Sequence, residues 1–150
     1  MRQIGLVMCT LLAGAGAAIS AGGPASAQTP GGQGDGTVLV SLVRQDFSDC
    51  NNGNVSTRDP SLVQGTAWVT RQPDGTTAVK VGLTVQPKTT YHFYLKCVRQ
   101  LGDIVTDEEG IGSAVFSFPT NAVGSVYAFD MYPQGAPLGN KFQSVQVSNR

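Results

Sequence analysis

The chain has 150 residues, of which ten are basic and ten acidic, so its formal net charge at pH 7 is zero. This balance excludes a basic stripe for nucleic acid and a polybasic segment for anionic lipid. Charged residues make up 13% of the chain and hydrophobic residues 41%, a composition typical of a folded domain and not of a disordered chain.

The N-terminal segment has the features of a secretory signal peptide. Arg2 supplies the positive start, residues 4–19 form an uncharged apolar run, and Ala25-Ser26-Ala27 supplies the small side chains that signal peptidase requires. Cleavage after Ala27 predicts a secreted, periplasmic or cell-envelope protein. An uncleaved anchor is disfavoured because the run is shorter than the ~20 residues of a membrane-spanning helix. A lipid anchor on Cys9 is disfavoured because this residue lies inside the run and not after it.

Removal of residues 1–27 changes the cysteine count. It leaves 150 − 27 = 123 residues, with nine basic and ten acidic side chains and a net charge near −1. Two of the three cysteines remain, and we predict a disulfide between Cys50 and Cys97 in the oxidising compartment. For a loop of 97 − 50 = 47 residues, chain entropy indicates a stabilisation of about 4 kcal/mol. A reactive or metal-binding thiol pair is the alternative.

Strand patterns begin after a short polar leader. Residues 28–36 hold no apolar residue to bury, so we expect a flexible leader, and residues 37–150 form the predicted domain. Apolar runs and period-two alternation predict about eight strands in this domain. They cover residues 38–43, 64–71, 76–85, 91–98, 101–106, 111–118, 123–132 and 142–147.

The segments between these strands differ in length. Pro73-Asp74-Gly75 and residues 107–110 have the composition of hairpin turns. Residues 46–62 form a much longer polar segment, which is unusual inside a compact domain. Cys50 lies in this segment, so the predicted disulfide would attach it to the sheet.

Alternation assigns the side chains of each predicted strand to two faces. Val79, Val81 and Leu83 share the apolar face of their strand, while in the next strand Cys97 is assigned to the apolar face and His92 to the polar face. The first strand is apolar at nearly every position, which indicates cover on both faces or a change of sheet. Since no amphipathic helix is present, we predict an all-β fold, a single antiparallel β-sandwich of immunoglobulin-like architecture.

Few side chains indicate catalysis or metal binding. His92 is the only histidine, and a solvent-facing strand position is favoured over a role as ligand or general base, because no nucleophile motif surrounds it. We assign no catalytic residue and no cofactor. Four acids around one turn are the best calcium ligands on offer, but their spacing does not match an EF-hand and a solvated turn is favoured. They are Asp103, Asp107, Glu108 and Glu109.

Three aromatic residues are candidate binding residues. Trp68, Tyr94 and Tyr132 lie on faces that are opposite to the main apolar stripe or ambiguous. Exposed rings on a flat sheet can stack on sugars or contact a protein partner. The alternative is that these rings fill the sandwich or its edge.

Residues 64–97 resemble part of a known group of domains. The resemblance is carried by turn and core residues, namely Gly65-Thr66-Ala67-Trp68-Val69, Asp74-Gly75, Val79-Lys80-Val81-Gly82-Leu83, Pro87 and Thr90-Tyr91. They look like the central hairpin and following strand of small secreted β-sandwiches, such as chordin-type domains and, more remotely, copper/zinc superoxide dismutases. Those dismutases have a His-x-His copper pair on the equivalent strand, where this chain has Tyr91-His92-Phe93-Tyr94. The resemblance therefore implies a fold and no dismutase activity.

The sequence leads to a functional hypothesis with alternatives. We predict an exported, non-enzymatic binding or cell-envelope interaction module, with a protein or glycan as partner, no nucleic acid, and no membrane span after cleavage. The motivation is a stable all-β scaffold with a long attached loop and no converging catalytic groups. A small secreted hydrolase or enzyme inhibitor is the alternative, and a structural subunit is a third reading. The oligomeric state stays open.

Overall fold

The computed structural model describes residues 36–136 and 140–149. The predicted signal peptide, residues 28–35 of the predicted leader, and residues 137–139 and 150 lie outside this part of the chain. Among the described residues, no helix has the length and hydropathy that a membrane crossing requires.

Strands dominate the described chain, and two single-turn 3-10 helices lie between them at Pro60–Leu62 and Thr120–Ala122. The strands are β1 (Thr37–Val43), β2 (Val63–Arg71), β3 (Thr76–Thr84), β4 (Thr90–Leu95), β5 (Arg99–Val105), β6 (Ile111–Pro119), β7 (Val126–Tyr127), β8 (Phe129–Tyr132), β9 (Phe142–Ser144) and β10 (Val147–Ser148). The prediction of an all-β fold is confirmed.

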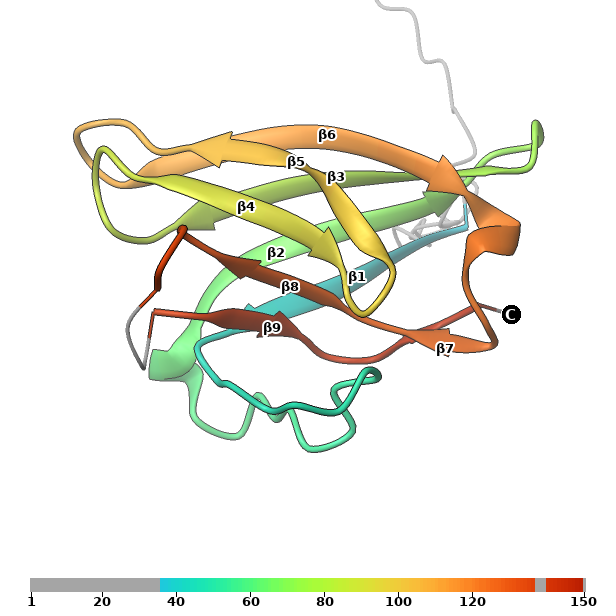
Figure 1. Cartoon of the computed structure of the whole chain (residues 1–150), viewed down its shortest axis with the longest axis horizontal. Coiled ribbons are helices and arrows are strands. Elements are labelled where there is room, and N and C mark those ends of the chain that lie inside the picture. Colours follow the sequence, from blue (N-terminus) through green and yellow to red (C-terminus); the bar gives the residue numbers. More distant parts are fainter. Residues whose placement is uncertain (1–35, 137–139, 150) are drawn as a thin grey trace, which may run out of the picture. The chain divides into compact units, whose positions relative to one another are not determined.

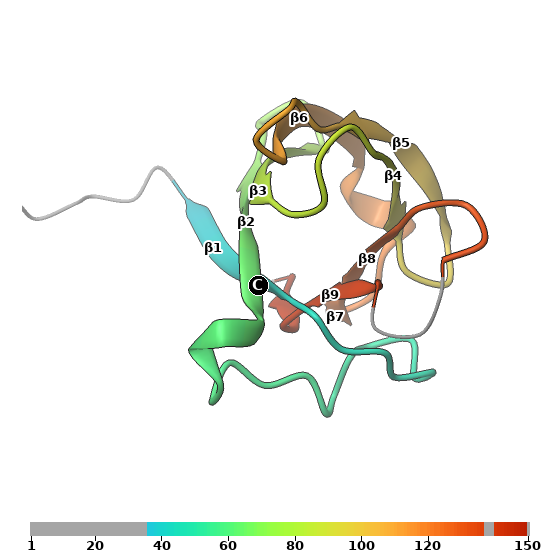
Figure 2. The same cartoon turned by 90° about the vertical axis from the view of Figure 1, so that its left-hand side faces the viewer.

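Eight strands form one antiparallel sheet in the order β5-β4-β8-β9-β1-β2-β3-β6, and β7 pairs separately with β10 (Figure 1). The sheet curls until its strands lie around a ring (Figure 2). Its two edges, β5 and β6, approach each other without forming a ladder. A Cβ on Gly102 would lie 2.6 Å from the Phe116 ring, and one on Gly112 would lie 3.1 Å from Ile104. Side chains and not backbone hydrogen bonds therefore close the nearly barrel-like sandwich.

Aromatic side chains fill the centre of the ring. The Phe93 ring stacks between Phe116 and Phe129, with centroid distances of 5.2 and 5.3 Å. Around these rings pack aliphatic side chains from most strands, including Leu42, Ala67, Val79, Val81, Ile104 and Met131, all at most 1% exposed. The predicted faces of the 76–85 strand are confirmed, because Val79, Val81 and Leu83 point into this core.

Two predicted strands are interrupted. The strand predicted at 123–132 is divided into β7 and β8 by Ala128, and the strand predicted at 142–147 is divided into β9 and β10. The first piece of one strand, β7, and the last piece of the other, β10, leave the large sheet and pair with each other. Continuous apolar alternation does not encode such a change of partner strand.

The first strand is only partly covered. Val40, Leu42 and Val43 are buried, whereas Val38 and Leu39 are 46% and 63% exposed. The prediction that β1 is covered on both faces is therefore wrong for its first half. That half pairs with β2 alone, since β9 reaches only Leu42 and Val43.

The predicted position of Cys97 on an apolar strand face is also wrong. β4 ends at Leu95, and the amide of Val98 donates to the Leu95 carbonyl at 3.0 Å in a turn that leads into β5. Cys97 takes the left-handed conformation in this turn (φ 58°) and is exposed. The chain must reverse there to pair β5 with β4, so strand alternation stops before Cys97.

Candidate functional site

The outer face of β1, β2, β3 and β6 presents a row of side chains around Trp68. Leu39, Trp68, Lys80 and Val115 are successive cross-strand partners, and we call them the outer row. Leu39 is 63% exposed and Val115 is 70% exposed, while Trp68 is half-buried between them. The Lys80 Nζ lies 5.7 Å from the centroid of the Trp68 ring, within the range of a cation–π contact.

Open hollows flank Trp68 on this face. One, of about 270 Å³, is lined by Thr37, Trp68, Thr70, Gln72, Ala78, Lys80 and Val115. The indole also lies over Gly82, where an added Cβ would come within 3.3 Å of the ring. An open hollow of about 650 Å³ lies against the paired ends of β2 and β3 and is lined by residues 63–66 and 82–85. The ring thus forms a ridge on a shallow surface, which suits an extended partner better than a small enclosed ligand.

The other two predicted aromatic residues lie together on a different part of the sheet. Tyr94 on β4 and Tyr132 on β8 stack with a centroid distance of 4.9 Å and an interplanar angle of 13°. The Lys141 Nζ lies 5.5 Å from the Tyr132 ring and 3.1 Å from Asp46 Oδ2. Burial, and then the neighbouring Tyr94, raise the pKa of Tyr132. Strands β9 and β1 lie between this pair and the strand that carries Trp68, so the three residues do not form one site.

His92 faces its cross-strand neighbour Asp103. The His92 Nδ1 lies 2.7 Å from Asp103 Oδ1, and Gln100 Nε2 donates to the same oxygen at 2.6 Å. The His92 side chain is 23% exposed and points away from the core, since its neighbours Tyr91 and Phe93 are buried. A carboxylate at this distance holds an imidazole in one orientation. Among the described residues, no hydroxyl or thiol is hydrogen-bonded to His92.

Three of the four acids considered as calcium ligands have partners of their own. Asp103 faces His92, and Glu108 Oε1 lies 2.8 Å from Lys88 Nζ. Asp107 Oδ1 accepts from the amides of Glu109 and Ile111 at 3.0 and 2.8 Å, which stabilises its own turn. In the described part of the chain, no group of three or more His, Cys, Asp or Glu side chains is placed to hold a metal ion.

We therefore expect calcium to leave the thermal stability of the protein unchanged. A cation that binds the folded state raises the melting temperature by mass action. The measurement is the melting temperature in millimolar calcium and in chelator, with magnesium as the control for ionic strength. A calcium-specific rise that disappears in Asp107→Asn would contradict this expectation and support calcium binding by these acids.

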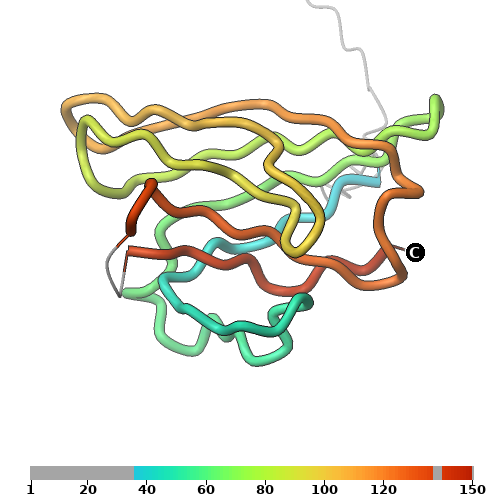
Figure 3. Tube along the Cα trace, viewed as in Figure 1, coloured from blue at the N-terminus to red at the C-terminus, as the bar shows by residue number. Residues whose placement is uncertain are grey.

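The long polar segment predicted at 46–62 is present and lies against β9 and the β4–β5 turn (Figure 3). We call residues 44–62 the clamped segment, because both of its ends and its middle are attached. The Arg44 amide donates to the Leu62 carbonyl at 2.8 Å and so closes its base. The predicted disulfide is present, joining Cys50 to Cys97 with a Cα–Cα distance of 5.6 Å.

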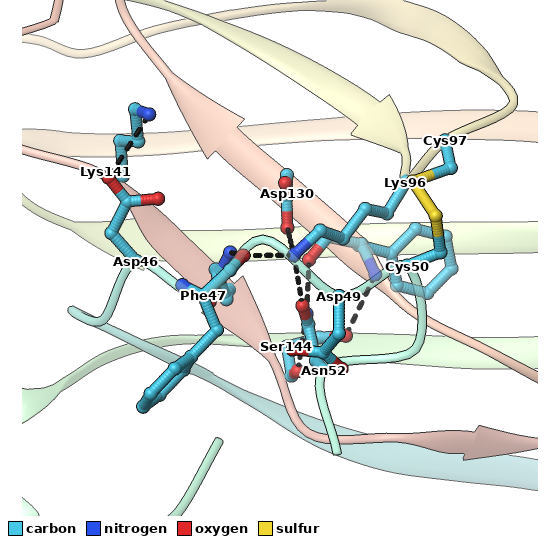
Figure 4. A network of polar contacts seen from close by, with 12 residues as sticks. Asp46, Phe47, Asp49, Cys50, Asn52, Lys96, Cys97, Asp130, Lys141 and Ser144 are labelled. Atoms are coloured by element: carbon cyan, nitrogen blue, oxygen red, sulfur yellow. Dashed lines mark hydrogen bonds and ion pairs between the residues drawn. A yellow bond between two sulfur atoms is a disulfide. The ribbon is translucent and has the colours of Figure 1, made fainter. Parts of the chain in front are cut away.

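A buried polar network holds the same segment beside the disulfide (Figure 4). The Lys96 Nζ donates to the Phe47 carbonyl at 2.7 Å and to Asn52 Oδ1 at 2.5 Å, and lies 3.6 Å from Asp130 Oδ1. Gln143 pairs with the Phe47 backbone, since its amide donates to the Phe47 carbonyl and accepts from the Phe47 amide, each at 2.8 Å. Burial raises the pKa of Asp130, and Lys96 opposes this effect.

Sequence reasoning missed this network. Alternation assigned Lys96 to a polar strand face, and Asn52-Gly53 has the composition of a turn, yet Lys96 is 8% exposed and Asn52 1% exposed. A signal was nevertheless present: Lys96 precedes Cys97, and Asn52 follows Cys50 by two positions. A disulfide between the cysteines brings these neighbours close together.

No protein-family model matches the chain, and no curated protein matches it.

Proposed function

We propose that the protein is an exported, non-enzymatic binding module that contacts a protein of the cell envelope through the outer row. One observation carries this proposal. Leu39, Trp68 and Val115 form an apolar row across four paired strands, with a single lysine among them. Exposed apolar patches of this kind mark interaction surfaces, and tryptophan is among the residues enriched at their energetic centres.

Export is supported by the sequence and by the disulfide. The predicted signal peptide over residues 1–27 would deliver the chain to an oxidising compartment, and the Cys50–Cys97 bond is compatible with that location. We further propose an immunoglobulin-like architecture, with the relationship to chordin-type domains that residues 64–97 indicate. The curled antiparallel sheet supports a relationship of this general kind.

The His92–Asp103 contact favours a second candidate, a small secreted hydrolase. An aspartate beside a histidine holds the ring in the tautomer that a general base needs. We rank this candidate below the binding module, because both side chains lie on an open sheet surface and Asp107, Glu108 and Glu109 do not converge on them.

Replacing Trp68 by alanine should abolish binding to the envelope partner. The mature chain is immobilised, incubated with a solubilised envelope fraction, and the retained protein is identified and then purified. We expect its dissociation constant to rise at least about 30-fold for Trp68→Ala, the loss typical of a residue at an interface centre.

The matched control is Tyr94→Ala, which removes an aromatic side chain from the other candidate surface. Its binding should equal that of the unmodified chain. Loss of binding in Tyr94→Ala but not in Trp68→Ala would move the site to the tyrosine pair. Retention of envelope polysaccharide in place of protein, lost in Trp68→Ala, would show a glycan partner and contradict the protein partner proposed here.

A further inference from the structure

Three side chains with complementary chemistry meet inside the buried network. Lys96 lies in the β4–β5 turn, Asn52 in the clamped segment and Asp130 on β8. The Lys96 Nζ lies 2.5 Å from the carboxamide oxygen of Asn52 and 3.6 Å from Asp130 Oδ1 (Figure 4). The Lys96 and Asp130 side chains are 6% and 16% exposed. An amine nucleophile, an amide carbonyl and a carboxylate are thus gathered where water is largely excluded.

The carboxamide is held in a fixed orientation. Asn52 Nδ2 donates to the carbonyls of Phe129 and Ser144, at 3.2 and 2.9 Å. The Asn52 backbone is in the left-handed conformation (φ 52°), which turns its side chain towards the sheet. The amine is held as well, because Lys96 Nζ also donates to the Phe47 carbonyl at 2.7 Å. Fixing two reacting groups side by side removes most of the entropic barrier to their reaction.

The carboxylate is placed to move protons between these two groups. Asp130 Oδ1 is buried and faces the amine, at 3.6 Å from Lys96 Nζ. Burial raises the pKa of Asp130, which makes its carboxylate a stronger base than an exposed aspartate. Asp46 adds a smaller effect in the same direction.

We propose that Lys96 and Asn52 form an intramolecular isopeptide bond with Asp130 as the proton carrier. Asp130 accepts a proton from the Lys96 ammonium, and the free amine attacks Asn52 Cγ. The Nζ–Cγ bond forms, Asp130 delivers its proton to Nδ2, and the Cγ–Nδ2 bond breaks. Asp130 then takes the second proton from Nζ and passes it to the departing ammonia. One amide replaces another and one ammonium ion is released, so neither water nor an oxidant is consumed. The new amide N–H is then placed to donate to Asp130 Oδ1.

The bond would join the same two segments as the disulfide. Asn52 and Lys96 lie 44 residues apart, and Cys50 and Cys97 lie 47 apart. The clamped segment would then be attached by one reducible and one non-reducible link. This inference does not depend on the proposed binding function, and its test uses no partner.

Mass spectrometry of the mature, folded protein tests the bond directly. Its intact mass after reduction should be about 17 Da below the mass calculated from its sequence, because one ammonia has left. Trypsin cleaves after lysine only when the amine is free. After reduction and alkylation, residues 45–58 and 89–99 should therefore appear as one cross-linked species, and the free peptide 89–96 should be missing.

Two variants separate the reaction from a simple contact. Asp130→Asn keeps the shape of the side chain but carries no proton, so it should release peptide 89–96 in full. Lys141→Met removes a nearby lysine that pairs with Asp46 and makes no contact with Asn52, Lys96 or Asp130, so the cross-link should remain complete. A free 89–96 peptide in the disulfide-bonded, folded wild type would overturn the proposal.

Discussion

Replacing Phe129 by alanine is expected to lower the free energy of unfolding by about 3–5 kcal/mol. The Phe129 ring is fully buried and lies 5.3 Å from Phe93, 5.7 Å from Tyr127 and 6.3 Å from Phe118. These rings belong to strands that are fixed by their own hydrogen-bond ladders, so they cannot close the space left behind. Equilibrium urea unfolding measures the change.

The matched control is Phe47→Ala. The Phe47 side chain is 37% exposed, whereas its backbone amide and carbonyl make the contacts with Gln143 and Lys96. Since the substitution preserves the backbone, we expect a change within about 0.5 kcal/mol. Equal destabilisation by both substitutions would contradict a core centred on Phe129.

Removing the disulfide should have very different effects in two backgrounds. In Asp130→Asn, where no isopeptide bond forms, Cys50→Ser with Cys97→Ser should cost about 4 kcal/mol, the chain-entropy value for the 47-residue loop. In the wild-type background the same two cysteine substitutions should lower the free energy of unfolding by about half as much. The isopeptide bond already closes nearly the same loop, and the disulfide then closes a ring of only about five residues.

Urea unfolding of four proteins measures both free-energy costs in one thermodynamic cycle. They are the wild type, Asp130→Asn, the cysteine double variant, and the combination of all three substitutions. The coupling between Asp130 and the cysteine pair should be about 2 kcal/mol. Cys9 is not a control in this experiment, because it belongs to the predicted signal peptide. Equal costs in the two backgrounds would mean that the disulfide alone closes the loop, and would agree with a free lysine in the mass measurement.

Features that depend on nearby residues could be predicted from the sequence. The turn at Pro73-Asp74-Gly75 is present, with Gly75 at φ 83° and the Asp74 side chain accepting from the Thr76 amide at 2.9 Å. The buried face of β3 follows from alternation, because successive strand side chains point to opposite sides. The disulfide followed from the cysteine count once the signal peptide was removed.

Features that depend on distant strands could not be predicted. Trp68, Tyr94 and Tyr132 were grouped as candidate binding residues, but the strand order places Trp68 on one surface and the tyrosine pair on another. Lys96 was assigned to a solvated face, because alternation cannot show that a segment some 44 residues earlier in the chain lies over it.

The amino-acid sequence by itself determined the all-β class, the hairpins and the pairing of Cys50 with Cys97, since these follow from local patterning and from a count. The tertiary structure decided which side chains share a surface and which polar groups are buried together. The physical reason is that strand order and loop packing result from contacts across the whole curled sheet. A lysine becomes a buried neighbour of an asparagine only after those contacts have formed.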